Sequence, residues 1–206
     1  MNWKQIDNIL KAQIANKSGI QDGYSQIKKV LTDNELPSVD IDIDKLKKEF
    51  DKWLADVITK EPIPKNIKSL YFGLATIAFP EIDDGKEQTT VYIAGSRLTP
   101  KQGEDWACDT AYFPNRRYLL LTEFDKIDNL IKSNDNLGGD YEVFVFNGLL
   151  NLLVLNALTD FRDRLMTYQD KKFGFFKTSK KRDSMHFGAG FDSGEVYVLG
   201  ELKNEY

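Results

Sequence analysis

The stretch that decides the fold is SLYFGLATIAF, residues 69–79. Apolar residues fill successive positions in it, as in a β-strand that is covered on both faces. An Asp-Asp-Gly turn signal follows at residues 83–85, and then come residues 89–94, which are rich in strand-forming types. This pattern predicts a β-hairpin in the middle of the chain.

The residues before this hairpin predict helices, because their apolar residues recur at spacings of three and four. The first predicted helix carries Trp3, Ile6, Leu10 and Ile14, and a shorter second one carries Tyr24, Ile27, Val30 and Leu31. The third helix is the clearest, with an apolar stripe of Leu46, Phe50, Trp53, Leu54, Val57 and Ile58. Its predicted N-cap is Asp44, and Pro62 and Pro64 break the chain after it.

The residues after the hairpin predict both helices and strands. Residues 95–117 look irregular, residues 118–122 predict a short strand and residues 124–131 a helix. A long helix is predicted over about residues 147–166, and a closing hairpin over residues 186–191 and 195–199. The most apolar run, residues 143–158, is shorter than the roughly 20 residues that span a bilayer. It is also interrupted by Asn147, Asn151 and Asn156, so we expect a buried helix and no membrane contact.

These elements predict an α+β fold, with N-terminal helices (about 1–61) packed on a mixed or antiparallel sheet (about 67–206) that also contacts one long buried helix. The 206 residues are 41% hydrophobic and 29% charged, which is ordinary for a globular protein, and we expect a single domain. Cys108 is the only cysteine, and the first residues lack the apolar run of a secretory signal, so the expected location is the cytoplasm.

Motifs of familiar chemistry are missing from the sequence. It has no Gly-rich phosphate loop, no paired cysteines and no HExxH helix, and its single histidine is His186. Alternating Asp40, Asp42 and Asp44 resemble the start of a calcium loop, but the glycine and glutamate that such a loop requires are replaced by Lys45 and Asp51. We therefore expect no metal, no cofactor and no catalysis. An unfamiliar hydrolase or transferase site near Asp105, Asp109 and His186 remains an alternative.

Residues 105–117 form the most unusual stretch, because they combine carboxylates with aromatic rings and guanidinium groups. Tryptophan, tyrosine and arginine dominate the energetics of protein interfaces. The candidate partner-binding residues here are Asp105, Trp106, Tyr112, Arg116 and Arg117. The alternative is an irregular loop that Trp106 and Tyr112 pin to the core, with its Asp and Arg residues paired at the surface. Cys108 is expected to be a small buried residue.

A second candidate is the basic run KKFGFFKTSKKR, residues 171–182. Its six cations could follow a phosphate backbone while its phenylalanines stack on bases. The candidate nucleic-acid-binding residues are Lys171, Lys172, Lys177, Lys180, Lys181 and Arg182. The formal net charge of the whole chain is −4, and nucleic-acid-binding modules tend to be basic. We therefore favour a solvated loop here over a nucleic-acid site.

Two short motifs resemble immunity proteins of bacterial polymorphic toxin systems. They are DWAC at residues 105–108, followed by Tyr112 and Pro114, and GFDSGEVY at residues 190–197. The resemblance covers the chain from about Ile67 onward. It implies a small cytoplasmic antidote that binds a cognate toxin and has no catalysis of its own. It also implies surface or scaffold roles for Asp105, Trp106, Tyr112 and Asp192, and it leaves the oligomeric state open.

Overall fold

A computed structural model of the chain describes residues 2–78, 85–134, 136–171, 177–192 and 194–204. The helices in this part are α1 (Trp3–Ala15), α2 (Ile20–Asp33), α3 (Ile43–Lys60), α4 (Phe124–Lys132), α5 (Gly139–Asp160) and α6 (Arg162–Leu165), with two short 3₁₀ helices, η1 (Pro100–Gln102) and η2 (Glu104–Cys108). The strands are β1 (Ser69–Ala78), β2 (Glu87–Ser96), β3 (Tyr118–Leu119), β4 (Thr167–Lys171), β5 (Lys177–Lys181), β6 (Ser184–Phe191) and β7 (Tyr197–Lys203).

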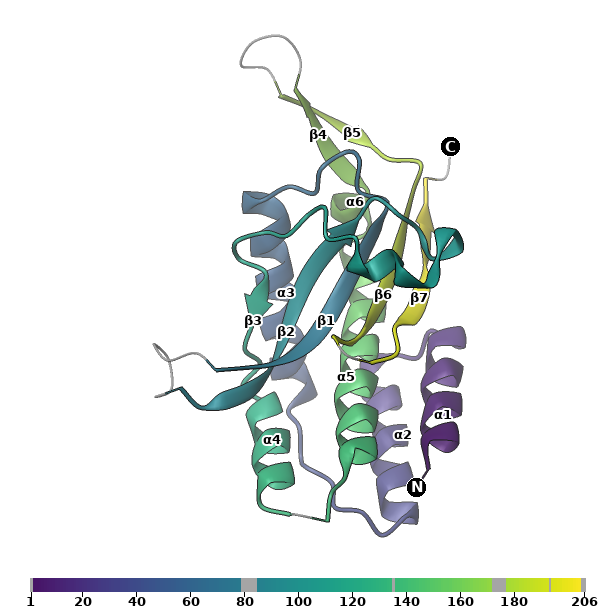
Figure 1. Ribbon diagram of the computed structural model, residues 1–206, viewed down its shortest axis with the longest axis vertical. Coiled ribbons are helices and arrows are strands. Elements are labelled where there is room, and N and C mark those ends of the chain that lie inside the picture. Colours follow the sequence, from purple (N-terminus) through teal and green to yellow (C-terminus); the bar gives the residue numbers. More distant parts are fainter. Residues whose placement is uncertain (1, 79–84, 135, 172–176, 193, 205–206) are drawn as a thin grey trace.

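The main sheet has the strand order β3-β2-β1-β6-β7 (Figure 1). The predicted hairpin is confirmed, because β1 and β2 pair antiparallel from Ser69 opposite Ser96 to Ala78 opposite Glu87. The closing hairpin is confirmed as well, as the antiparallel pair β6 and β7. β1 and β6 pair in parallel, so the sheet is mixed and the predicted α+β fold is confirmed. The predicted turn residues Asp83 and Asp84 lie outside the described residues.

The helices pack on one face of this sheet, called the inner face here, and lie behind it in Figure 1. Leu70, Phe72 and Leu74 alternate along β1, are fully buried and belong to one hydrophobic cluster with residues of all three N-terminal helices. Trp3 does not share this burial, since its side chain is 40% exposed at the start of α1. The apolar stripe of α3 is buried as predicted, from Leu46 to Ile58.

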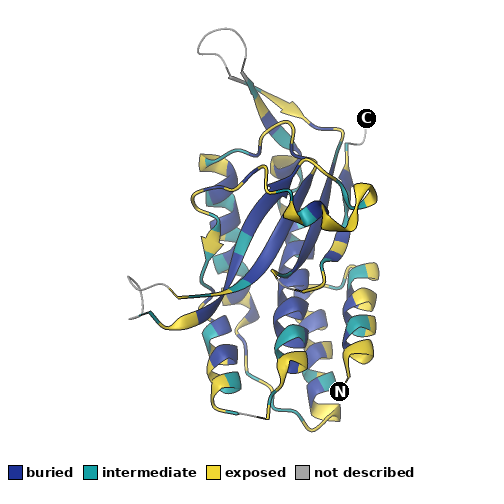
Figure 2. Cartoon of the chain, in the orientation of Figure 1, coloured by how far each residue is buried: buried dark blue, intermediate teal, exposed yellow. Residues whose placement is uncertain are grey.

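Helix α5 runs through the centre of the protein and is buried along most of its length (Figure 2). It begins at Gly139 and ends at Asp160, so the predicted range of about 147–166 was wrong at both ends. Its apolar residues surround the helix, and such a sequence has no period from which the ends can be read. By length and composition alone α5 could cross a membrane, but 72% of its apolar segment is buried inside the protein.

Three further predictions differ from the structure. Asp42 rather than Asp44 caps α3, because the Asp42 side chain accepts a hydrogen bond from the backbone N–H of Lys45 and the helix starts at the buried Ile43. The predicted strand at residues 118–122 is reduced to the two residues of β3. The predicted loop at residues 171–182 contains a hairpin instead, because β4 and β5 pair antiparallel through backbone groups that need no apolar pattern. Residues 172–176 lie outside the described part.

Glu123 joins the start of α3 to the start of α4. Its carboxylate is 1% exposed and accepts hydrogen bonds from the backbone N–H of Asp42 and from the ammonium groups of Lys45 and Lys126. Burial alone would raise the pKa of this carboxyl. The hydrogen bonds from Lys126, Asp42 and Lys45 outweigh burial, so the pKa lies below its usual value of 4.5.

Replacing Glu123 with Gln is expected to lower the free energy of unfolding by about 1 kcal/mol at neutral pH, because the amide loses the charge that both lysines face. A lowered pKa in the folded state means that the stabilisation is present above pH 4.5 and disappears as the pH falls through the folded pKa. Urea unfolding of both proteins at neutral and acidic pH measures this difference. A difference between the wild type and the Glu123→Gln variant that persists unchanged in acid contradicts the role assigned to the Glu123 charge. The control is Asp44→Asn, at an exposed position of α3.

Candidate binding surface

The outer face of the sheet, opposite the helices, is crossed by the segment that carries η1 and η2 (Figures 1 and 2). The strand register places Tyr118, Tyr92 and Gly73 side by side on adjacent strands, with Gly190 of β6 next to Gly73. Tyr71 lies on the same face, because it is two residues before Gly73 in β1. Aromatic and glycine positions therefore meet on one face of four strands, β3, β2, β1 and β6.

The rings on this face form a continuous aromatic ladder, which we define as Trp106, Tyr71, Tyr92, Tyr118 and Phe113. The ring centroids are 6.4 Å apart for Trp106 and Tyr71, and 5.9 Å apart for Tyr71 and Tyr92. Tyr92 in turn lies 6.1 Å from Tyr118 and 6.4 Å from Phe113. All four pairs meet edge to face, the geometry that aromatic quadrupoles favour.

Two glycines make room for the ladder. A Cβ atom at Gly73 would lie 2.1 Å from the Tyr92 ring, and one at Gly188 would lie 2.7 Å from the Trp106 ring. Contacts this short do not occur, so a side chain at either position would displace the ring above it. Glycine in the middle of a strand often marks such a close approach.

The two ends of the ladder differ in exposure. Trp106 and Tyr71 are 3% and 5% exposed, whereas Phe113 and Tyr118 are 46% and 37% exposed. At the exposed end, the Arg117 guanidinium lies 3.9 Å from the Phe113 ring centroid and 4.5 Å from that of Tyr118. Aromatic residues and arginine often anchor protein interfaces, and here two exposed rings lie beside an arginine.

The buried end of the ladder forms the wall of a hollow of about 710 Å³, called the acidic hollow here. Its lining brings together the predicted residues Asp105, Trp106 and Asp192. The Tyr92 hydroxyl donates a hydrogen bond of 2.5 Å to the Asp192 carboxylate, and the Tyr71 hydroxyl donates one of 2.7 Å to the Gly190 carbonyl. The lining comprises Tyr71, Tyr92, Pro100, Glu104, Asp105, Trp106, Ala107, Cys108, Thr110, Asp192, Gly194, Glu195, Val196 and Val198.

Both tyrosine hydroxyls stay protonated at neutral pH. Burial is the largest cause that raises the pKa of Tyr71 and of Tyr92, and the Asp192 carboxylate raises both further. The two hydroxyls therefore act as hydrogen-bond donors and not as bases.

The remaining predicted residues of this stretch hold the loop in place. Tyr112 is 7% exposed and its hydroxyl donates to the Glu61 carbonyl at 2.6 Å. The Glu61 carboxylate accepts the backbone N–H groups of Asn115 and Arg116, and the Arg116 side chain pairs with Asp56 at 3.2 Å. Tyr112 and Arg116 thus lie away from the acidic hollow and tie residues 112–116 to the end of α3.

The three residues of the alternative enzyme site do not line one hollow in the described part of the structure. Asp105 and Cys108 line the acidic hollow, but Asp109 and His186 do not. Asp109 is bound by the Arg97 side chain at 2.9 Å, and His186 lies 3.7 Å from Glu201 on the neighbouring strand. The expectation that Cys108 is buried was wrong, because η2 turns Trp106 inward and leaves Cys108 exposed. Among the described residues, no group of three His, Cys, Asp or Glu side chains could hold a metal ion.

The basic candidates of residues 171–182 whose side chains the structure describes have partners in the protein. Lys180 pairs with Asp170 at 2.7 Å, and Lys181 pairs with Asp163 at 2.6 Å. Arg182 is 7% exposed and donates to backbone carbonyls, so it does not face solvent. Lys172, and the side chains of Lys171 and Lys177, lie outside the described part of the structure.

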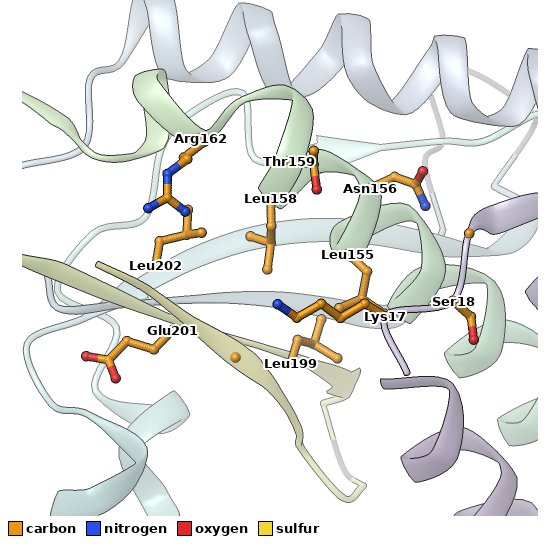
Figure 3. Close-up of a pocket in the computed structure, with 12 residues that line it drawn as sticks. Lys17, Ser18, Leu155, Asn156, Leu158, Thr159, Arg162, Leu199, Glu201 and Leu202 are labelled. Carbon is orange, nitrogen blue, oxygen red and sulfur yellow. The ribbon is translucent and has the colours of Figure 1, made fainter. Parts of the chain in front are cut away.

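A second hollow of about 350 Å³ lies between the α1–α2 turn, the end of α5 and β7 (Figure 3). Figure 3 shows Lys17, Arg162 and Glu201 around it, together with the side chains of Asn156 and Thr159. The lining carries both charge signs, and Arg162 already donates to the Lys203 carbonyl at 2.6 Å. This hollow therefore selects no particular ligand charge.

Sequence reasoning missed Tyr71, Tyr92, Tyr118, Phe113 and Glu104 as members of the surface. The signal that could have found Tyr71 and Gly73 was their spacing of two in a predicted strand, which places them on one face. Comparisons of the chain with protein-family models, with curated proteins and with solved structures found no match.

Proposed function

We propose that this chain is a non-catalytic binding protein of the immunity type, which neutralises a cognate bacterial toxin in the cytoplasm. One observation carries the proposal. The two motifs that resemble immunity proteins are far apart in sequence, but residues 105–108 of the first and Asp192, Gly194, Glu195 and Val196 of the second line the same acidic hollow. The residues of a binding site are expected to gather at one place on the surface, whereas scaffold residues would be spread through the core.

The aromatic ladder supplies the contact area for such a partner. Its exposed end, Phe113 and Tyr118 with Arg117 stacked on both rings, continues from the acidic hollow along the outer face of the sheet. Rigid aromatic side chains bury much area on binding and lose little conformational entropy. The toxin is therefore expected to cover both the exposed rings and the hollow.

The test is to express the chain beside the gene immediately upstream of it and to measure growth. We expect the neighbour to be toxic alone and harmless when this chain is present. Phe113→Ala and Tyr118→Ala together are expected to weaken toxin binding at least tenfold, since each removes an aromatic contact (about 1 kcal/mol or more per hot spot). Affinity measured with purified proteins checks this loss.

The matched control is Trp3→Ala, which removes an aromatic side chain of similar exposure (40%) from α1. It should leave both rescue and affinity unchanged. A neighbour that is harmless in both cases argues against the toxin assignment. A toxin that binds the double variant as tightly as the wild type places the interface elsewhere on the protein.

A further inference from the structure

We propose that the acidic hollow binds a basic side chain, arginine or lysine, presented by the toxin. The inference rests on the proposed function for the identity of the partner, but its chemistry comes from the hollow alone. Three observations carry it: the charges at the rim, the aromatic wall and the shape of the site.

The charges of the lining have one sign. Its ionisable residues include the carboxylates of Glu104, Asp105, Asp192 and Glu195, and no Lys or Arg is among its described lining residues. Glu104 and Asp105 are exposed, and their carboxylates form no hydrogen bond or ion pair with other described residues. Glu195 is 3.6 Å from the exposed Lys11, and Asp192 accepts from neutral Tyr92. A cation entering the hollow therefore meets carboxylates that the protein itself leaves largely uncompensated.

The wall of the hollow suits the rest of a basic side chain. Trp106 and Tyr71 line it, and aromatic rings attract the methylene stem of a lysine or arginine as well as its charged end. Gly188 lies beneath the Trp106 ring, where a Cβ atom would come within 2.7 Å of it, and so allows the ring to pack against the sheet as a fixed part of this wall. A planar guanidinium would combine contact with a ring and hydrogen bonds to carboxylates.

The volume of the acidic hollow and the spacing of its carboxylates fit a side chain better than a metal ion. A volume of about 710 Å³ is large enough for an extended side chain and its hydration. A metal ion needs several ligands within about 2–2.6 Å of one point. No three described acidic, His or Cys side chains converge in that way. The spread carboxylates therefore fit a long organic cation inserted from a protein surface.

The test uses N-acetylarginine methylamide as a probe, titrated into the full chain and followed by NMR of the indole N–H groups. Trp106 can be told from Trp3 and Trp53 by single Trp→Phe variants. We expect the Trp106 signal to shift and saturate, and the neutral analogue N-acetylcitrulline methylamide to bind several-fold more weakly. An unmoved Trp106 signal, or equal binding of the neutral analogue, overturns the inference.

Asp105→Asn is expected to weaken probe binding roughly two- to fivefold, the range of one exposed ion pair. The control is Asp22→Asn on α2, which changes the net charge equally at an exposed site outside the hollow. Equal effects of both variants would also overturn the inference. If the probe binds but this chain does not rescue growth, the acidic hollow still binds a cation and the proposed function is wrong. If the chain rescues growth but the probe does not bind, the proposed function stands and the inference about the hollow is wrong.

Discussion

Replacing Arg182 with Met is expected to lower the free energy of unfolding by about 3 kcal/mol. The guanidinium of Arg182 donates to the carbonyl of Ile67 at 2.8 Å and to that of Ile63 at 3.2 Å, and it lies 5.7 Å from the Tyr168 ring centroid. Methionine keeps the apolar contacts but leaves these buried carbonyls without a donor. Burial lowers the pKa of Arg182 to about 10, so the side chain remains charged at neutral pH.

Urea unfolding measures the loss, and Lys181→Met is the matched control on the preceding residue. Lys181 pairs with Asp163 at 2.6 Å with both side chains well exposed, so its removal should cost less than about 1 kcal/mol. Equal losses in the two variants would contradict the structural role of Arg182. A small loss at Arg182 with weakened nucleic-acid binding would instead favour the basic segment as a nucleic-acid site.

Replacing Asn151 with Leu is expected to raise the free energy of unfolding by about 2 kcal/mol. Asn151 is 1% exposed in the middle of α5, and neither polar atom of its amide has a hydrogen-bond partner among the described residues. Leucine has the same branching and adds no buried polar group. Thermal and urea unfolding both measure the change.

The control is Asn156→Leu, because the Asn156 amide is half-buried and donates to the Leu152 carbonyl at 2.9 Å. That substitution should change the stability by less than about 1 kcal/mol. The prediction is wrong if Asn151→Leu and Asn151→Ala lower the free energy of unfolding by similar amounts. That result would mean that buried water satisfies the Asn151 amide.

Local sequence signals located elements wherever one face of an element is apolar. The stripe of α3 and the hairpin of β1 and β2 show a clear period, and both are confirmed. Helix α5 is apolar on every side, so its sequence indicated a buried helix but placed its start eight residues too late. The strands β4 and β5 were missed because their pairing uses backbone groups and ion pairs, which leave no apolar alternation to detect.

The candidate binding surface was also predicted only in part from the sequence. The sequence singled out Asp105, Trp106 and Asp192, because their residue types and short motifs are unusual. It did not reveal that they meet, since the parallel pairing of β1 with β6 joins residues more than a hundred positions apart. It also singled out Tyr112 and Arg116 as partner-binding candidates, and the structure adds that both are tied to the end of α3, away from the acidic hollow.

The sequence by itself determined the three N-terminal helices, the two hairpins of the main sheet and the α+β fold, because periodicity and turn residues act over short distances. Only the tertiary structure decided that Tyr92 lies over Gly73 and that Trp106 lies over Gly188. These contacts depend on strand register and on the path of residues 97–117 across the sheet. Both result from long-range packing, which fixes the acidic hollow and the aromatic ladder but leaves no local pattern in the chain.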